Sequence, residues 1–417
     1  MQQSAAIASA PTEQQTTVVT GRTMVAMTCQ VQWQCEHARH TDGYHAMKLN
    51  LGRDLVAPEL ERQLCGQPVG TTASHTFAAG DLLPAAQDQD VLQIPASCFN
   101  RRLRRFHTVE PLAGRYYPRG YIAGVADIAP EDRRPFRVAR VGEQLEIDLK
   151  HPLAHRELTL SAVVGEAWPA GDEHDSRCND LGEMVTENGP GMQTRWRDLP
   201  TDFWSGQPFK RELPTADAEF YTQARMVHHI DSTARGLVRD LYARLADPAG
   251  ETLDLMSSWV SHLPTHWPAG SVVGLGLNAE ELAANPVLGE YLVQDLNADP
   301  KLPLADGRFS SVICTVSVEY LTRPLEVFAE IRRVLRPGGR CVITFSDRWF
   351  PPKVIALWQE LHAFERMGLV LEYFLQDGGF TDLETWSMRG LPRPEDDKYA
   401  NRLACSDPIF AVWGSRA

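Results

Sequence analysis

The sequence predicts two folded parts, a mostly β N-terminal domain and an α/β domain with a doubly wound, mostly parallel sheet. Its 417 residues are enough for two domains. In the first half, apolar and polar residues alternate over Glu157–Val164, which is the period of half-buried strands. In the second half, short apolar runs alternate with amphipathic helical segments, the pattern of a parallel sheet covered on both faces.

Charge and composition exclude several classes of protein. The chain has 41 Lys and Arg against 54 Asp and Glu, a formal net charge of −13, which disfavours nucleic acid as a partner. No apolar run reaches the roughly 20 residues of a membrane span, so we expect no membrane contact. Met1–Gly21 lacks the apolar core of a secretory signal. Eight scattered cysteines favour a reduced, cytoplasmic protein over a disulfide framework.

The N-terminal part is expected to begin after a disordered leader. Residues 1–22 are rich in Gln, Thr, Ala and Ser and have no apolar periodicity. Residues 23–168 contain short apolar runs between turn residues, with strands expected at Val25–Val31, Gln144–Leu149 and Glu157–Val164. This part therefore reads as a β-rich domain.

Residues 169–214 are expected to form an irregular linker or lid. Gly, Pro, Asp and Asn crowd this segment, as in Asn188-Gly-Pro-Gly, and periodicity disappears. It nevertheless carries Trp196, Phe203 and Trp204, which a free tether rarely does. We expect it to lie across the next domain and to form part of that domain's ligand pocket.

Residues 215–417 alternate between helices and strands. Apolar stripes predict helices over Asp231–Ala246 and Leu325–Leu335, the latter with Leu325 and Phe328 facing inward and Pro337-Gly-Gly stopping it. Short buried strands are expected at Thr252–Met256, Val272–Leu275, Tyr291–Val293, Ser311–Val316, Arg340–Ser346 and Ile409–Trp413. Ligands of such sheets bind at the carboxyl ends of the strands.

Three stretches of this domain resemble the class I S-adenosylmethionine-dependent methyltransferases. They are Leu302-Pro-Leu-Ala-Asp-Gly-Arg-Phe-Ser-Ser-Val-Ile, Tyr320-Leu, and Glu330-Ile-Arg-Arg-Val-Leu-Arg-Pro-Gly-Gly. The resemblance covers about Tyr221 to Ala417 and implies a Rossmann-like fold with S-adenosylmethionine as cofactor. It also implies where each strand end meets the cofactor.

At the first strand–helix turn, Asp254 matches the family, but the usual glycines are replaced by Met256, Ser257, Ser258 and Trp259. After the second strand, Gly276 stands where the family usually has an acid for the ribose, so Asn278 or Glu280 is expected to take that role, or Gly276 lets the ribose pack closely. After the third strand, Asp295 matches the acid that accepts from the adenine amine; an N-cap role is the alternative. Leu277, Leu296 and Thr315 complete the expected cofactor contacts.

The fourth strand and the segment before the first strand are expected to face the reacting methyl group. Glu319 and Tyr320 follow the fourth strand and could position or deprotonate an acceptor, although Tyr320 could equally be packing. Upstream, Tyr221, Arg225, His228 and His229 are candidates for a lid; each could equally be structural. Because adjacent side chains on a helix diverge, only one histidine is expected to face the pocket.

The acceptor is expected to be a small molecule. No Asn-Pro-Pro-Tyr segment follows the fourth strand, which reads Thr315-Val-Ser-Val-Glu, so amide or nucleobase methylation is disfavoured. Within small molecules the sequence leans weakly to a thiol. Residues up to Trp168 include 17 basic and 18 acidic side chains and the rest 24 and 36, so the acidic second half should repel polyanions.

The N-terminal part resembles the SlyD-type FKBP peptidyl-prolyl isomerases. The motifs are His151-Pro-Leu-Ala in a closing hairpin, Leu60-Glu-Arg-Gln-Leu-Cys-Gly-Gln-Pro-Val-Gly, and Ile94-Pro. The resemblance implies an inserted flap near Phe99–Phe136. Leu82-Leu-Pro and His155 depart from the family pattern. This half could be an isomerase or chaperone beside an inactive methyltransferase-like half, or a scaffold that makes a homodimer or another protein contact.

Two further clusters, one of Cys and His and one of Arg, are not expected to bind a ligand. Cys29, Cys35, His37 and His40 lack the close Cys-x-x-Cys spacing of zinc sites, so no metal is expected. The arginines at 101, 102, 104 and 105 are expected to form a solvated loop rather than an anion site.

Overall fold

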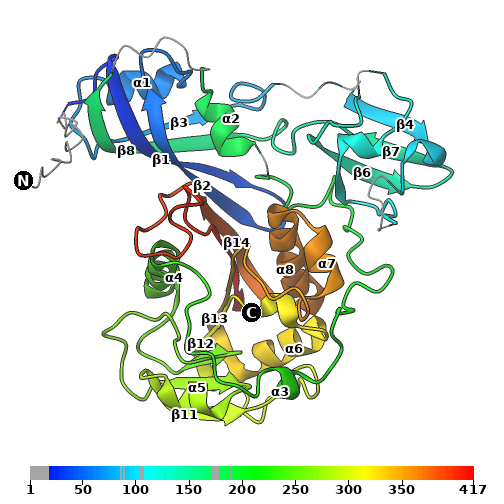
Figure 1. Ribbon diagram of the computed structural model, residues 1–417, viewed down its shortest axis with the longest axis vertical. Coiled ribbons are helices and arrows are strands. Elements are labelled where there is room, and N and C mark those ends of the chain that lie inside the picture. Colours follow the sequence, from blue (N-terminus) through cyan, green and yellow to red (C-terminus); the bar gives the residue numbers. More distant parts are fainter. Residues whose placement is uncertain are drawn as a thin grey trace, which may run out of the picture.

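The computed structural model describes residues 18–84, 87, 90–102, 108–126, 128–170, 178–187 and 189–417 (Figure 1). Most of the expected leader, residues 1–17, lies outside the described residues, as do Arg104, Arg105 and Asn188. Within the described part, no helix is both long and apolar enough to cross a membrane. All eight cysteines are free thiols.

Eleven strands form one continuous sheet in the order β11-β10-β9-β12-β13-β15-β14-β2-β1-β8-β3. Four come from the N-terminal part: β1 (Thr23–Gln34), β2 (Arg39–Asn50), β3 (Thr72–Phe77) and β8 (Leu158–Pro169). Seven come from the C-terminal part: β9 (Thr252–Leu255), β10 (Val272–Gly276), β11 (Leu288–Val293), β12 (Phe309–Thr315), β13 (Leu335–Phe345), β14 (Phe380–Arg389) and β15 (Ile409–Arg416). The N-terminal strands thus extend the C-terminal sheet.

The C-terminal strands build a doubly wound sheet. Strands β9 to β13 run parallel to one another, and β15 is antiparallel to both β13 and β14. The α-helices among the described residues are α1 (Pro58–Leu64), α2 (Leu181–Thr186), α3 (Asp217–Phe220), α4 (Ser232–Leu245), α5 (Ala279–Ala284), α6 (Pro324–Val334), α7 (Ala356–Glu360) and α8 (Ala363–Asp377).

Alternate strand residues pack on opposite faces of this sheet. Val312 and Ile343 join the core that contains α6 and α8, whereas Ile313 and Val342 join the core beneath α4. These strands are therefore buried on both sides, which is why they read as continuous apolar runs.

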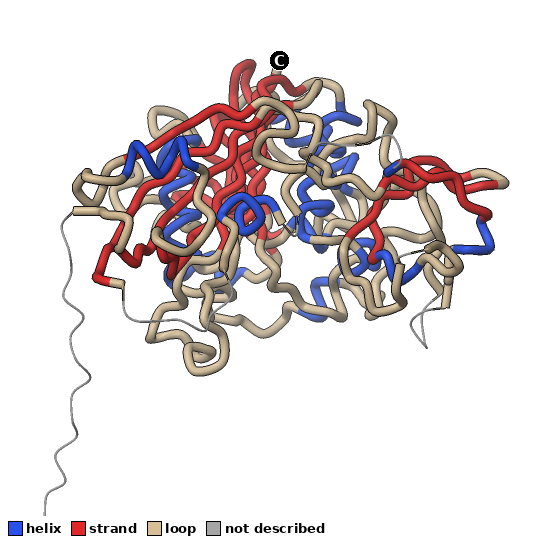
Figure 2. Tube along the Cα trace, turned by 90° about the horizontal axis from the view of Figure 1, so that it is seen from above, coloured by secondary structure: helices blue, strands red, loops and turns tan. Residues whose placement is uncertain are grey.

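A second, four-stranded sheet is inserted between β3 and β8. Its strands are β4 (Val91–Pro95), β5 (Tyr116–Pro118), β6 (Pro135–Val141) and β7 (Gln144–Asp148), in the order β4-β7-β6-β5. It has its own core around Phe99, Tyr117 and Phe136. Figure 2 shows this sheet at the side of the main body, apart from the eleven-stranded sheet.

The segment after β8 lies along α8, as its aromatic content suggested. Arg195 forms an ion pair with Glu372 of α8 at 2.6 Å, and the ring of Trp204 lies 6.3 Å from that of Tyr373. The expectation that this segment forms part of the ligand pocket is wrong for its described residues, since none up to Pro214 lines the pocket described below. The polar and aromatic side chains of this segment contact helix α8 instead.

The elements expected in the C-terminal part are all present, with two differences. Leu325 is 40% exposed rather than buried, because the inward stripe of α6 consists of Val327, Phe328, Ile331 and Val334. The helix ends at Val334, and the following Leu-Arg-Pro-Gly-Gly belongs to the extended strand β13 instead of a turn.

Candidate active site

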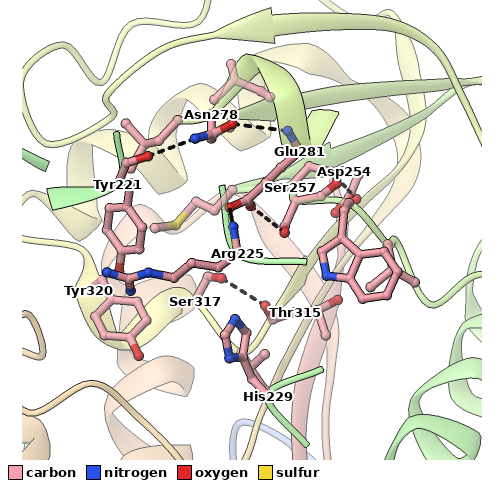
Figure 3. A pocket seen from close by; sticks show the side chains of 18 of the residues that line it. Tyr221, Arg225, His229, Asp254, Ser257, Asn278, Glu281, Thr315, Ser317 and Tyr320 are labelled. Carbon is pink, nitrogen blue, oxygen red and sulfur yellow. Dashed lines mark hydrogen bonds between the residues drawn. The ribbon is translucent and has the colours of Figure 1, made fainter. Parts of the chain in front are cut away.

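A pocket opens at the carboxyl ends of β9, β10 and β12 and is covered by residues of the segment before α4 (Figure 3). Of the candidate residues singled out from the sequence, all but Glu280 and Glu319 line it. Its free space is about 1170 Å³ when the open mouth of the pocket is included.

The turn after β9 supplies the pocket's buried carboxyl group. Asp254 is 3% exposed and accepts a 2.5 Å hydrogen bond from Ser257 Oγ. Burial raises the pKa of Asp254 to about 7, opposed by the hydrogen bonds from Ser257 and Ser261. Met256 stands where the family has glycine and adopts the left-handed conformation at φ 57°. The backbone at this turn therefore has the left-handed conformation that glycine adopts easily, and in Met256 this conformation is strained because of its Cβ atom.

The absence of an acid at Gly276 has a steric reason. A Cβ atom at this position would lie 2.2 Å from the carbonyl oxygen of Ser257. The turn after β9 passes so close to β10 that only glycine fits, and a carboxylate side chain there is excluded.

Asn278 lines the pocket, but its amide is engaged. Its oxygen caps α5 by accepting from the backbone N–H groups of Glu280 and Glu281, and its Nδ2 donates to the carbonyl of Tyr221 at 2.9 Å. Glu280 is exposed and does not line the pocket.

The pocket's carboxylate on this side is Glu281, which sequence reasoning missed. It accepts from the backbone N–H of Arg225 and from Ser258 Oγ, both at 2.7 Å. It lies in the first turn of α5, where acidic residues are common because they stabilise the positive end of the helix dipole. Its position in the sequence therefore indicated helix stability rather than ligand binding.

Asp295 lines the pocket after β11. Its Oδ1 accepts from the backbone N–H groups of Asn297 at 2.9 Å and Ala298 at 3.4 Å, which is the capping contact weighed as the alternative role. Within the described ranges no hydrogen bond to its Oδ2 is formed, so this oxygen can accept from a ligand. Leu296 and Leu277 add apolar surface beside it.

At the end of β12, Thr315 and Ser317 face the pocket centre. Ser317 Oγ donates to the Thr315 carbonyl at 2.9 Å, and Val316 between them has φ 42°. A β-branched residue at positive φ is a genuine outlier, and strain of this kind clusters at functional sites.

Tyr320 lines the pocket, whereas Glu319 points elsewhere. The Tyr320 hydroxyl accepts from the Phe350 backbone N–H at 2.8 Å, and burial raises its pKa. Glu319 is 1% exposed, and neither of its carboxylate oxygens has a hydrogen-bond partner among the described residues. Burial raises its pKa to about 8. The expectation that Glu319 acts on an acceptor is wrong for this pocket, because the short helical turn Val318–Tyr320 sends adjacent side chains in different directions.

Both histidines line the pocket, contrary to the expectation of one. The chain from Tyr221 to Ile230 is not helical, so neighbouring side chains are not forced apart. The His228 ring lies 4.6 Å from Trp259 and the His229 ring 5.2 Å from Phe350. Burial lowers the pKa of both histidines, which favours their neutral form.

Cys35 and His40 contact each other at 3.2 Å away from this pocket, and among the described residues no group of three or more His, Cys, Asp or Glu could hold a metal ion.

The C-terminal part contains a methyltransferase domain on a Rossmann-like, doubly wound sheet. Residues 258–343 match the family model of a methyltransferase domain. The residues present fit the cofactor: a close backbone approach at Gly276, carboxyl groups at Asp254 and Asp295, and apolar walls.

The chain is similar to two curated proteins named ubiquinone/menaquinone biosynthesis C-methyltransferase UbiE. It is 29% identical to that of Desulfotalea psychrophila over 139 residues, 32% of this chain and 55% of the relative. It is 30% identical to that of Paraburkholderia xenovorans over 110 residues, 26% of this chain and 44% of the relative. The chain thus spans about half the length of the curated relatives it matches.

Among solved structures, the chain is similar to a SAM-dependent methyltransferase from Thermotoga maritima, with 13% identity and a TM-score of 0.34 over 48% of this chain and 94% of that one. It is also similar to geranyl diphosphate C-methyltransferase from Streptomyces coelicolor, with 15% identity and a TM-score of 0.29 over 44% and 77%.

Proposed function

We propose that this chain transfers a methyl group from S-adenosylmethionine to a small-molecule acceptor. The observation that carries the proposal is the gathering of Asp254, Gly276 and Asp295 at adjacent strand ends around one pocket, within and beside the span that matches the methyltransferase family. The bound cofactor would supply an electrophilic methyl group on a sulfonium. The chain's part is to bind, orient and exclude water.

Each side of the pocket has a separate task in this proposal. Asp295 offers its free carboxylate oxygen to the adenine amine, between the apolar side chains of Leu277 and Leu296. Asp254 and Ser257 face the cofactor's amino-acid end. Tyr221 and His228 belong to the segment that covers the site.

The acceptor loses a proton during or before transfer, and His229 is the base in this proposal. It lines the pocket beside Phe350, and burial lowers its pKa, which favours the neutral form that a base needs. The curated relatives are named C-methyltransferases, which favours an activated carbon as the nucleophile. Nothing in the pocket supports the thiol acceptor that the sequence weakly favoured.

For the N-terminal part we propose a scaffold role. Two motifs behind the SlyD resemblance do not lie as it implies: His151-Pro-Leu-Ala joins β7 of the four-stranded sheet to β8 of the eleven-stranded sheet and is not a hairpin turn, and Ile94-Pro lies in β4 of the four-stranded sheet. In addition, β2 pairs with β14 and so extends the C-terminal sheet. A prolyl-isomerase assay on the full chain tests the alternative: turnover of a proline peptide above the uncatalysed rate would favour it. A homodimer through this half and a cytoplasmic location, in keeping with eight free thiols, remain part of the proposal.

The proposal is tested by incubating the full chain with trideuteriomethyl S-adenosylmethionine and a small-molecule extract of the cells that produce it. Mass spectrometry should find a metabolite that gains the labelled methyl group and S-adenosylhomocysteine in equal amount. Asp295→Ala should weaken cofactor binding about tenfold or more, as expected for loss of one hydrogen bond to a charged acceptor. Absence of label in every metabolite with the wild-type chain contradicts the proposal.

A further inference from the structure

One cation stands in the pocket without a compensating acid. Arg225 is the one arginine or lysine among the described residues that line the pocket. Its guanidinium carbon lies 4.7 Å from the ring centroid of Phe220, 5.5 Å from that of Tyr221 and 5.2 Å from that of Phe350. Three aromatic rings thus hold the charge in place.

The guanidinium edge is left largely unused. In the part of the chain that the structure describes, its one hydrogen bond is a long one, 3.5 Å from Nη2 to the Phe220 carbonyl, and it forms no ion pair with a carboxylate. Two other arginines are paired with carboxylates: Arg211 contacts Asp217 at 2.5 Å, and Arg393 contacts Asp407 at 2.7 Å. Stacking on ring faces leaves in-plane N–H donors free, which is the geometry that binds a carboxylate or phosphate in bidentate fashion.

The neighbouring acids of the pocket are already committed. Asp217 is bound by Arg211 and by Lys353 at 2.9 Å. Glu281 accepts from the backbone N–H of Arg225 and from Ser258, and no contact joins it to the guanidinium. The positive charge of Arg225 is therefore not cancelled from within the pocket.

The guanidinium also lies on the side away from the turn after β9. Figure 3 shows it reaching toward Tyr221 and Tyr320, with Asp254 on the opposite side of the pocket. Tyr320 follows β12, and its ring lies 6.3 Å from that of Phe350. Arg225 therefore faces the region left for the acceptor when the cofactor's amino-acid end lies against Asp254 and Ser257.

We propose that Arg225 binds an anionic group, a carboxylate or phosphate, on the acceptor, and that Phe350 and Tyr320 pack against the acceptor's apolar body. This inference rests on the proposed methyltransferase function and narrows its substrate to small organic anions. The cofactor's own carboxylate has the same chemistry, so the experiment separates the two sources.

The first arm measures binding by calorimetry to the wild-type chain and to Arg225→Met. S-Adenosylhomocysteine carries the amino-acid carboxylate, and 5′-methylthioadenosine lacks it. We expect Arg225→Met to change the dissociation constant of either ligand less than threefold. A loss of tenfold or more for S-adenosylhomocysteine alone would assign Arg225 to the cofactor and overturn the inference.

The second arm repeats the labelled-methyl incubation and passes the products over an anion exchanger at pH 7. We expect the labelled product to be retained as an anion, its formation to fall at least 30-fold in Arg225→Met, and Arg225→Lys to restore part of it. A labelled product that is neutral or cationic overturns the inference while leaving the methyltransferase function standing.

The matched control is Arg197→Met. Arg197 is also stacked on a ring, 4.6 Å from the centroid of Trp196, but it is exposed and does not line the pocket. The Arg197→Met variant should form the labelled product at the wild-type rate. Thermal melting of each variant verifies folding, and equal loss of labelling in both arginine variants would contradict a specific role for Arg225.

Discussion

Ser387 of β14 donates a 3.0 Å hydrogen bond to Asp42 of β2 across 345 positions of the chain. Asp42 is fully buried and also accepts from Trp33 Nε1 at 2.9 Å and from Gln193 Nε2 at 3.2 Å. Strands of both halves and the connecting segment therefore meet at one buried carboxyl group. The N-terminal part is fixed to the methyltransferase sheet by more than its backbone pairing.

This junction predicts cooperative unfolding. Asp42→Ala leaves the donors of Trp33, Gln193 and Ser387 without an acceptor, and we expect it to lower the free energy of unfolding by about 3 kcal/mol. Urea unfolding followed by fluorescence and circular dichroism should give one transition that shifts as a whole. Glu384→Ala, which breaks the exposed ion pair with Arg39 on the same strand pair, should cost less than about 1 kcal/mol. Two separate transitions, with only one affected by Asp42→Ala, would contradict the shared core.

Gly276→Ala tests the close approach of the β9 turn. The added methyl would meet the Ser257 carbonyl oxygen, so the turn must shift, and we expect a loss of about 2 kcal/mol in stability together with weaker cofactor binding. Gly236→Ala is the control, because a Cβ on this helical glycine of α4 would make only an ordinary contact, 3.8 Å from Arg239 Nη2, and alanine should stabilise the helix by about 1 kcal/mol. Calorimetric melting and S-adenosylhomocysteine titration measure both effects. Unchanged binding in Gly276→Ala would argue against a cofactor site at this turn.

Glu319 makes stability depend on pH. Its pKa is about 8 in the folded chain because of burial, against an ordinary value of 4.5. The folded state therefore holds a proton that the unfolded state has released, and stability is lost as pH rises from about 4.5 through 8. Glu319→Gln should reduce this loss by an amount on the order of 3 kcal/mol. Denaturation curves at pH 5, 7 and 8.5 measure the difference between the two proteins; parallel pH dependences would show that Glu319 is ionised when folded.

His229 should set the acid limb of turnover. Burial lowers its pKa below the ordinary 6.5, so the neutral base forms as pH rises through a value under 6.5 and the rate levels off near pH 7. His229→Gln should lower kcat about 100-fold and remove this limb. His228→Gln, whose ring packs on Trp259, should retain it. The rate of labelled-methyl transfer between pH 5 and 8 measures the profile; a limb that survives in His229→Gln would exclude His229 as the base.

The strand–helix alternation of the second half could be predicted from the sequence. Most of the pocket lining could be predicted as well, because the carboxyl ends of neighbouring strands in a doubly wound sheet lie close together. The sequence could not show Glu281 or Phe350, whose places depend on how a short helix and a loop fold over the sheet. It also could not place Glu319, since adjacent residues of a single turn diverge. The pairing of β2 with β14 is equally hidden, because contact between strands about 345 positions apart leaves no local pattern.

The central claim is that this pocket binds the methyl donor, and calorimetric titration of the full chain with S-adenosylhomocysteine tests it most directly. We expect one site per chain with a dissociation constant in the micromolar range, about −8 kcal/mol, and a loss of at least tenfold in Asp295→Ala. Absence of saturable binding by the folded wild-type chain, or equal affinity in Asp295→Ala, would contradict the account.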